Sequence, residues 1–242
     1  MFAVATVKEK SQVSALLSQM TKVPNDSLPA SAAGAKSSCC TVDIEPSWDV
    51  QTAVTGQQLR LNCFQYYRKH GHADYIGESV SQLEHACQAA YFAQQNNEST
   101  EMIVACFLHD IGHLLELESQ SMDGYGVLHH EDLGSAYLRS LGFSELICSV
   151  VGNHVKSKRY LVSVKEYYNC LSKASQKTLS FQGKTMSPDE IAAFEREPYF
   201  RESLRLRYYD DQAKIVDFKT PPLEHYERLS MDCLLRQHPT AL

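Results

Sequence analysis

The sequence of 242 residues lacks three features that would assign it to a specialised class of protein. None of its eight cysteines are spaced as C-x-x-C, which argues against a zinc-thiolate site. No block rich in lysine and arginine occurs and the formal net charge is −6, so no nucleic-acid partner is predicted. No stretch reaches the roughly 18 apolar residues that a membrane-spanning helix needs, so no membrane association is predicted.

The first residues, "MFAVATVKEK", also lack the basic start and long apolar segment of a signal peptide. Several cysteines lie inside apolar helical patterns, where a free thiol behaves as a small hydrophobic group. Unpaired thiols favour a reducing compartment. We therefore expect a cytoplasmic protein.

Residues 1–50 differ in composition from the rest of the chain. Their stretch "TKVPNDSLPASAAGAKSSCC" is rich in Ser, Ala and Pro and has no apolar period, which predicts a poorly ordered, flexible extension. A transit peptide is the alternative, but Lys8, Glu9 and Lys10, and the absence of arginine from this segment, argue against it. The division predicted is an extension over 1–50 and one domain over 51–242.

Strand-like alternation is scarce after residue 50, and apolar residues recur instead with a helical period. The stretch "STEMIVACFLHDIGHLL" has Ser99 as a candidate N-cap and is then apolar all round, which predicts one buried helix over 99–115. No heptad persists, so a coiled coil is not predicted. The expected fold class is all-α, a compact helical bundle.

The buried stretch ends in "LHDIGH", which places His109, Asp110 and His113 where charge is costly. An ionised carboxylate is buried only when it is paired or bound to a metal. A single histidine on a helix is more often structural, and we interpret His70, His72, His225 and His238 in that way. With His85, His130 and His154 on other predicted helices, however, the sequence offers nitrogen and oxygen ligands for two ions, a donor set that suits Fe, Mn or Co.

Six ordered blocks carry a resemblance to a known family. They are "YIGESVSQLEHA", "LHDIGH", "HEDLG", "NHVKSKRYL", "LSKASQKTLSFQG" and "MSPDEIAAFEREPYFRESLRLRYYDDQAK". Over about residues 52–220 they resemble the HD-domain superfamily, which is all-α and mostly binds one or two metals. Within it, the blocks are most similar to the mixed-valent di-iron oxygenases that cleave the carbon–phosphorus bond of 1-hydroxy-phosphonates.

The resemblance implies a metal centre of two iron ions, Fe(II) and Fe(III). One ion would be held by His85, His109, Asp110 and Asp210. The other would be held by His130 and His154, with Asp110 bridging the two. His129 and Asp211 are adjacent alternatives to His130 and Asp210. The family pattern favours His130, directly before Glu131, and Asp210, four residues before Lys214.

The implied reaction uses O2 as co-substrate to cleave a 1-hydroxy-2-aminoethylphosphonate or its trimethylamino relative. The products would be phosphate and glycine or glycine betaine. Tyr75, Glu78, His113 and Lys158 would act in catalysis and substrate binding. The full set of implied substrate-binding residues is Tyr75, Glu78, His113, Lys158, Ser175, Thr178 and Gln182.

Other interpretations of these residues stay open at the level of sequence. Tyr75 and Glu78, three apart, can share a helical face or form a helix N-terminal cluster, and Ser175 and Thr178 can be local caps. Lys158 can be a solvated surface residue. The pattern assigns no oligomeric state and no N-methylation state of the substrate, although an aromatic cage for a trimethylammonium group can be drawn from Tyr66, Tyr67, Tyr75 and Tyr125.

Three rival functions follow from the same blocks. The first is an HD-domain phosphohydrolase in which the same ligands activate water for attack on a phosphate ester. The second is a degenerate HD fold that serves as a binding module, which the complete ligand set argues against. The third is an oxygenase that acts on another hydroxylated amine or a polyol.

Overall fold

The computed structural model describes residues 56–75, 77–115, 122, 124, 126–164 and 166–237, with side chains from residue 63 onward. The predicted flexible extension over 1–50 lies outside the described residues. Within them the chain is helical and forms no strand, and Asp74 and Ser81 make one isolated bridge. The prediction of an all-α fold is confirmed.

The helices follow one another along the chain. They are α2 (Gly56–His70), α3 (Gln82–Gln95), α4 (Thr100–Leu108), the 3-10 helix η1 (Ile111–His113), α5 (His130–Ser140), α6 (Glu145–Gly152), α7 (His154–Val164), the 3-10 helix η2 (Tyr168–Cys170), α8 (Lys173–Leu179), α9 (Pro188–Phe194), α10 (Phe200–Gln212) and α11 (Leu223–Gln237). Within the described ranges, every helix is too short or too polar to span a bilayer.

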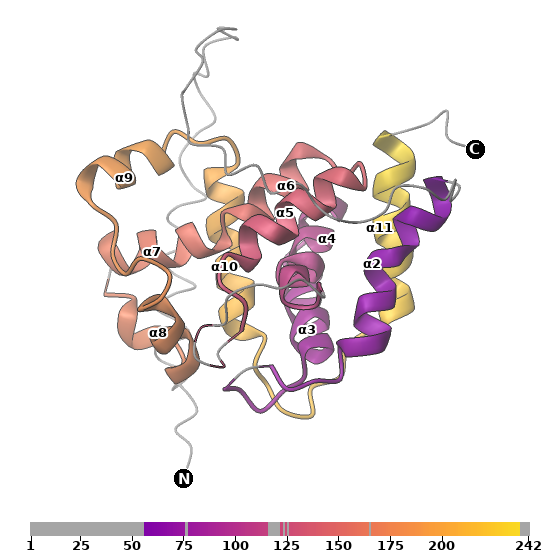
Figure 1. Ribbon diagram of the computed structural model, residues 1–242, viewed down its shortest axis with the longest axis horizontal. Helices are drawn as coiled ribbons and strands as arrows, with labels where there is room; N and C mark the ends of the chain where they lie inside the picture. The colour runs from indigo at the N-terminus through magenta and orange to yellow at the C-terminus, as the bar shows by residue number, and fades with distance from the viewer. Residues whose placement is uncertain are drawn as a thin grey trace, which may run out of the picture.

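The main core surrounds α4, which is apolar on all sides and lies at the centre of the bundle (Figure 1). Helices α3, α6, α10 and α11 pack against it. The Phe107 ring lies 4.7 Å from the ring of Tyr67 and 5.1 Å from that of Tyr226. The buried hydroxyls of these two tyrosines donate to the carbonyls of Phe107 and Cys87, so this aromatic cluster is packed without an unpaired polar group.

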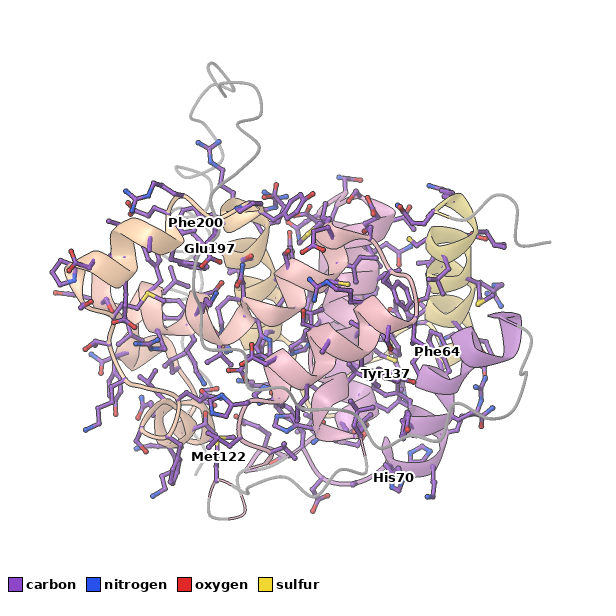
Figure 2. The ribbon with its side chains drawn as sticks, turned by 45° about the horizontal axis from the view of Figure 1, so that its top comes forward. Phe64, His70, Met122, Tyr137, Glu197 and Phe200 are labelled. Carbon is purple, nitrogen blue, oxygen red and sulfur yellow. The ribbon has the colours of Figure 1, made fainter. Side chains whose placement is uncertain are left out.

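A smaller core joins α7, α8 and α9, at the far side of α10 from α2 (Figure 1). The rings of Tyr160, Phe194 and Phe200 meet edge to face at 5.1 to 5.8 Å. Figure 2 labels Phe200 of this group, whereas Phe64 of α2 and Tyr137 of α5 are labelled on the other side of the molecule. The candidate site lies between the two cores.

The helix predicted over 99–115 is shorter than expected. Ser99 caps it as predicted, by accepting a hydrogen bond from the Met102 amide, but α4 ends at Leu108. Asp110 leaves the helical conformation (φ −101°, ψ 12°) and the 3-10 turn η1 follows. The helix ends because the backbone of α5 crosses closely here: a Cβ on Gly112 would lie 2.0 Å from the His130 carbonyl oxygen.

Gly112→Ala is therefore expected to destabilise the protein by about 3 kcal/mol, the upper part of the usual cost of overpacking, because the obstacle is backbone. Chemical denaturation of the purified variant measures the effect. Gly152→Ala is the matched control, since its Cβ would meet only the side chain of Ser135 at 3.2 Å. Equal stability of the two variants would contradict the close approach of η1 and α5.

Candidate metal centre

Four buried imidazoles converge from separate elements: His85 in α3, His109 after α4, and His130 and His154 at the first positions of α5 and α7. Each ring contacts a backbone carbonyl through Nδ1, at 2.7 to 3.1 Å; the acceptors are Ala213, Cys106, Val127 and Val151 in that order. A carbonyl can only accept, so Nδ1 carries the proton. A ring that carries no second proton then has its lone pair on Nε2, which faces the centre.

The Nε2 atoms come together in two pairs. They are 3.2 Å apart in His85 and His109, and 2.9 Å apart in His130 and His154. Two lone pairs at these distances repel each other unless a proton or a cation lies between or beside them. Each pair is thus a pre-arranged donor set for a cation.

Asp110 lies between the two pairs. Its Oδ2 is 3.5 Å from Nε2 of His85 and 3.2 Å from that of His109, whereas its Oδ1 is 3.5 Å from Nε2 of both His130 and His154. Burial alone would raise the pKa of this carboxyl group, but His109 and His130 hold it well below its usual value. The carboxylate is therefore ionised and offers one oxygen to each histidine pair.

Asp210 in α10 completes the first pair, and its neighbour does not. Its Oδ1 is 3.4 Å from Nε2 of His85, and its Oδ2 accepts from Nη1 of Arg207 at 2.5 Å. The side chain of Asp211 instead accepts from Tyr167 and Arg207, away from the imidazoles. His129 is likewise directed outward, with 68% of its side chain exposed.

The donor set fits a pair of cations. Asp110 Oδ2 and Asp210 Oδ1 are buried and make no hydrogen bond, an arrangement that costs free energy unless a cation satisfies them. Nitrogen and oxygen donors without thiolate are also the ligands that iron and manganese accept. All six predicted metal ligands are brought together, three of them (His85, His109 and Asp210) with donor atoms within 4.8 Å of one another.

A pocket opens beside the centre. Its walls are formed by Tyr75, Glu78, Gln82, Asp110, His113, Met122, His130, His154, Val155, Lys158, Ala174, Ser175, Thr178, Gln182, Arg207 and Asp210. All seven side chains predicted to bind substrate are in this set. Their roles stay predictions, but their common position is a feature of the fold.

Lys158 is not a surface lysine. It lies one turn after His154 in α7, as the four-residue spacing predicted, and is buried. Its Nζ donates to the Thr178 hydroxyl at 3.0 Å. Burial, with Arg207 nearby, lowers the pKa of its ammonium group to about 7. An anion entering the pocket would favour the charged form.

Ser175 and Thr178 belong to α8 but do not cap it, because Ser172 is the N-cap. The Ser175 hydroxyl accepts from Nζ of Lys214 at 3.1 Å. Neither residue is thus the N-cap of α8, although the Thr178 hydroxyl makes a local hydrogen bond to the Ser175 carbonyl at 3.2 Å, and both residues line the pocket.

His113 presents a donor to the pocket. Its ring stacks on His130, with centroids 3.8 Å apart, and its Nδ1 accepts from the Val127 amide at 3.1 Å. The proton of the neutral ring is thus on Nε2. Burial and the neighbouring His130 lower the pKa of His113 well below its ordinary value, which keeps the ring neutral.

The expectation that Tyr75 and Glu78 share a helical face is wrong. They lie in a turn before α3, closed by a hydrogen bond from the Glu78 amide to the Tyr75 carbonyl at 2.8 Å. The alternative of a helix N-terminal cluster is wrong as well, because Ser81 and Glu84 form the capping box of α3. The turn stacks the Tyr75 ring on His85, with centroids 3.8 Å apart.

The aromatic cage is wrong in part. Tyr67 is a core residue, and Tyr66 packs edge to face on Tyr137, at 6.0 Å. Tyr125 lies outside the described residues. Of the three that the structure describes, Tyr75 alone lines the pocket.

Sequence reasoning missed several residues of the pocket wall. They are Gln82, Met122, Val155, Ala174 and Arg207. Arg207 had a readable signal, since it lies three and four residues before Asp210 and Asp211 on one helix and pairs with both. The other four carry no charge or spacing that a sequence would reveal.

Comparison with known proteins identifies a family for this chain. The sequence pattern of the HD domain family matches residues 83–217. Protein L432 of Acanthamoeba polyphaga mimivirus is 45% identical over 171 residues, which cover 69% of this chain and 78% of the relative.

Two relatives carry functional names. A 1-hydroxy-2-(trimethylamino)ethylphosphonate dioxygenase (glycine-betaine-forming) of Leisingera caerulea is 39% identical over 66% of this chain and 82% of its own length. A hydroxymethylphosphonate dioxygenase of Gimesia maris is 39% identical over 71% of this chain and 86% of its own. The chain belongs to the HD domain family, in the group of oxidoreductases that includes these hydroxyphosphonate dioxygenases.

Proposed function

We propose that the protein is a di-iron, O2-dependent enzyme that cleaves the carbon–phosphorus bond of a 1-hydroxy-2-(amino or trimethylamino)ethylphosphonate. The products are phosphate and glycine or glycine betaine. The observation that carries the proposal is the buried Asp110, whose two oxygens each face one pair of histidine Nε2 atoms.

In this proposal His85, His109 and Asp210 hold one iron, His130 and His154 hold the other, and Asp110 serves both. The bound ions would supply Lewis acidity and the redox chemistry of O2. The protein orients the ligands through the Nδ1 contacts to backbone carbonyls, which also set the tautomer of each ring.

The pocket supplies complementary groups for a phosphonate. The Lys158 ammonium presents a cation to anionic oxygens. It donates one hydrogen bond to the Thr178 hydroxyl at 3.0 Å, and that hydroxyl donates its own hydrogen to the Ser175 carbonyl at 3.2 Å. Nε2–H of His113 is a further donor beside His130. Gln182 Oε1 is buried without a hydrogen-bond partner, so it can accept from a substrate hydroxyl or amine.

The amine of the substrate would meet Glu78. Its Oε1 is buried, makes no hydrogen bond and lies 3.7 Å from Nζ of Lys214, a loose ion pair. A substrate ammonium at this position would give the carboxylate a second cationic partner. Glu78 therefore favours an amine-bearing hydroxyphosphonate.

Substrate turnover tests the proposal directly. The iron-loaded protein should consume O2 and release phosphate from 2-amino-1-hydroxyethylphosphonate or its trimethyl analogue, and release should stop without O2. Phosphate release from a phosphate ester in the absence of O2, with no reaction on the phosphonates, would instead establish the phosphohydrolase.

Glu78→Gln should discriminate between substrates. We expect its kcat/KM to fall about 10- to 150-fold for 2-amino-1-hydroxyethylphosphonate, the value of one charge-assisted hydrogen bond of ~1.5–3 kcal/mol, because the ammonium group of this substrate can donate N–H bonds. It should change little for hydroxymethylphosphonate, which has no amine. An equal loss on both kinds of substrate would show that Glu78 does not bind the amine.

A further inference from the structure

Gln88 lies one turn after His85 on α3 and is only 1% exposed, although its side chain is polar. It is not one of the residues that line the pocket. Its carboxamide holds both backbone groups of Ile215: Oε1 accepts from the Ile215 amide at 3.0 Å, and Nε2 donates to the Ile215 carbonyl at 2.9 Å. A side chain that satisfies both groups of one distant residue fixes the position of that residue and the direction of its chain.

The segment held in this way, residues 213–215, reaches both sides of the site. The Ala213 carbonyl accepts from Nδ1 of His85 at 2.8 Å, and Nζ of Lys214 donates to the Ser175 hydroxyl at 3.1 Å and faces Glu78. One residue of the segment thus orients a metal-facing imidazole, and the next places a cation at the wall of the substrate pocket.

Apart from Gln88, the backbone of this segment is held by hydrogen bonds from the Ala213 amide to the Asp210 carbonyl at 3.1 Å and from the Lys214 amide to the Gln212 carbonyl at 2.9 Å. Farther along the chain, the Phe218 ring packs on Tyr91 and Phe92 of α3. Helix α10 ends at Gln212, and Ala213 has left the helical conformation (φ −80°, ψ 44°). Ile215 is exposed and Val216 is 55% exposed, so apolar burial contributes little beyond Ala213. The other three histidines differ from His85 here, because their carbonyl acceptors lie three residues earlier in the same local turn.

We propose that Gln88 is a positioning residue that clamps residues 213–215, and so sets both the orientation of His85 and the place of Lys214. His85 is the one imidazole of the centre whose acceptor comes from a segment 128 residues away. The tautomer of His85 and the angle of its ring toward the centre therefore depend on residues 213–215, which lie outside its own helix. The clamp also gives metal binding and substrate binding one common support.

The metal part of this inference rests on the proposed function, so the first measurement is made without metal. Gln88→Met keeps the length of the side chain and removes both hydrogen bonds. In the metal-free variant we expect faster exchange of the Ile215 amide hydrogen and altered ring nitrogen NMR signals of His85, with those of His154 unchanged. Unaltered His85 signals would overturn the proposal, whatever the enzyme does.

The second measurement uses Co(II) and then substrate. Gln88→Met should weaken Co(II) binding about 10- to 100-fold, the usual cost of losing a partner beyond the ligands, and alter the visible spectrum of the bound ion. It should also raise the KM for the hydroxyphosphonate. If the variant has a lower melting temperature but binds Co(II) with wild-type affinity and the wild-type spectrum, Gln88 has only a structural role, and the proposal is refuted.

Gln94→Leu is the matched control. Gln94 lies on the same helix, its Oε1 is 3.3 Å from Nε2 of His225, and it does not touch residues 213–215. It should leave the His85 signals and the Co(II) affinity at wild-type values, and equal losses in both variants would overturn the proposal. If Gln88→Met does not fold, Gln88→Glu keeps the acceptor for the Ile215 amide and loses the donor to the Ile215 carbonyl. It should still alter the His85 signals and weaken Co(II) binding, and wild-type values of both would overturn the proposal.

Discussion

Asp110→Ala is expected to remove both metal ions from the protein and to abolish phosphate release. Each oxygen of Asp110 faces one histidine pair, so a single truncation takes a ligand from both ions and removes the negative charge between them. The loss should exceed the roughly 10- to 100-fold that follows from deleting a partner outside the ligand set. Metal content by elemental analysis and O2 uptake measure it.

Asp132→Ala is the control for Asp110→Ala. Asp132 is an exposed carboxylate near the start of α5, and its one ion-pair partner is the exposed His129, at 3.7 Å. This variant should keep two metal ions and wild-type turnover. Two bound ions in Asp110→Ala would refute the bridging role, and loss of one ion alone would assign Asp110 to a single site.

Lys158→Ala is expected to raise the KM for the phosphonate about 10- to 150-fold, the value of a charge-assisted hydrogen bond of ~1.5–3 kcal/mol. The metal content should not change, because Lys158 contacts Thr178 and none of the histidines. Steady-state kinetics over a range of substrate concentrations, with elemental analysis of the same sample, give both quantities.

Lys156→Ala is the matched control for Lys158→Ala, because it removes the same side chain two residues earlier on α7. Lys156 is 45% exposed and pairs with Glu197 at the surface, at 3.0 Å (Figure 2 labels Glu197). Surface pairs contribute at most about 1 kcal/mol to stability, so this variant should bind substrate normally. Loss of iron from Lys158→Ala would instead give Lys158 a structural role.

Local sequence signals predicted a large part of the fold. The Ser99 cap, the apolar α4 and the four-residue spacing of His154 and Lys158 on α7 are properties of neighbouring residues, and each was read correctly. Local sequence signals do not predict a structure that depends on contacts with distant parts of the backbone. Nothing in "HDIGH" shows that α5 crosses over Gly112, so the early end of α4 was not predicted. The Tyr75–Glu78 turn was missed although it contains Gly77, whose φ of 78° is one that glycine adopts readily.

The choice between adjacent candidate ligands shows the same division between what a local pattern predicts and what the tertiary structure decides. Asp210 and Asp211 face different surroundings because one residue on a helix is a rotation of ~100°. His129 instead precedes α5 in the left-handed conformation (φ 60°) and is exposed, whereas His130 is the first residue of the helix and is buried. Family pattern preferred His130 and Asp210. Their burial against the other imidazoles supports that preference, although ligation itself stays a prediction.

The sequence by itself determined the all-α class and the ordered set of nitrogen and oxygen donors, because helical periodicity and residue type are local properties. Only the tertiary structure decided that Asp110 lies between two histidine pairs and that Gln88 supports the loop behind His85. These contacts join segments 20 to 128 residues apart, and their geometry depends on how the helices pack, which no local pattern specifies.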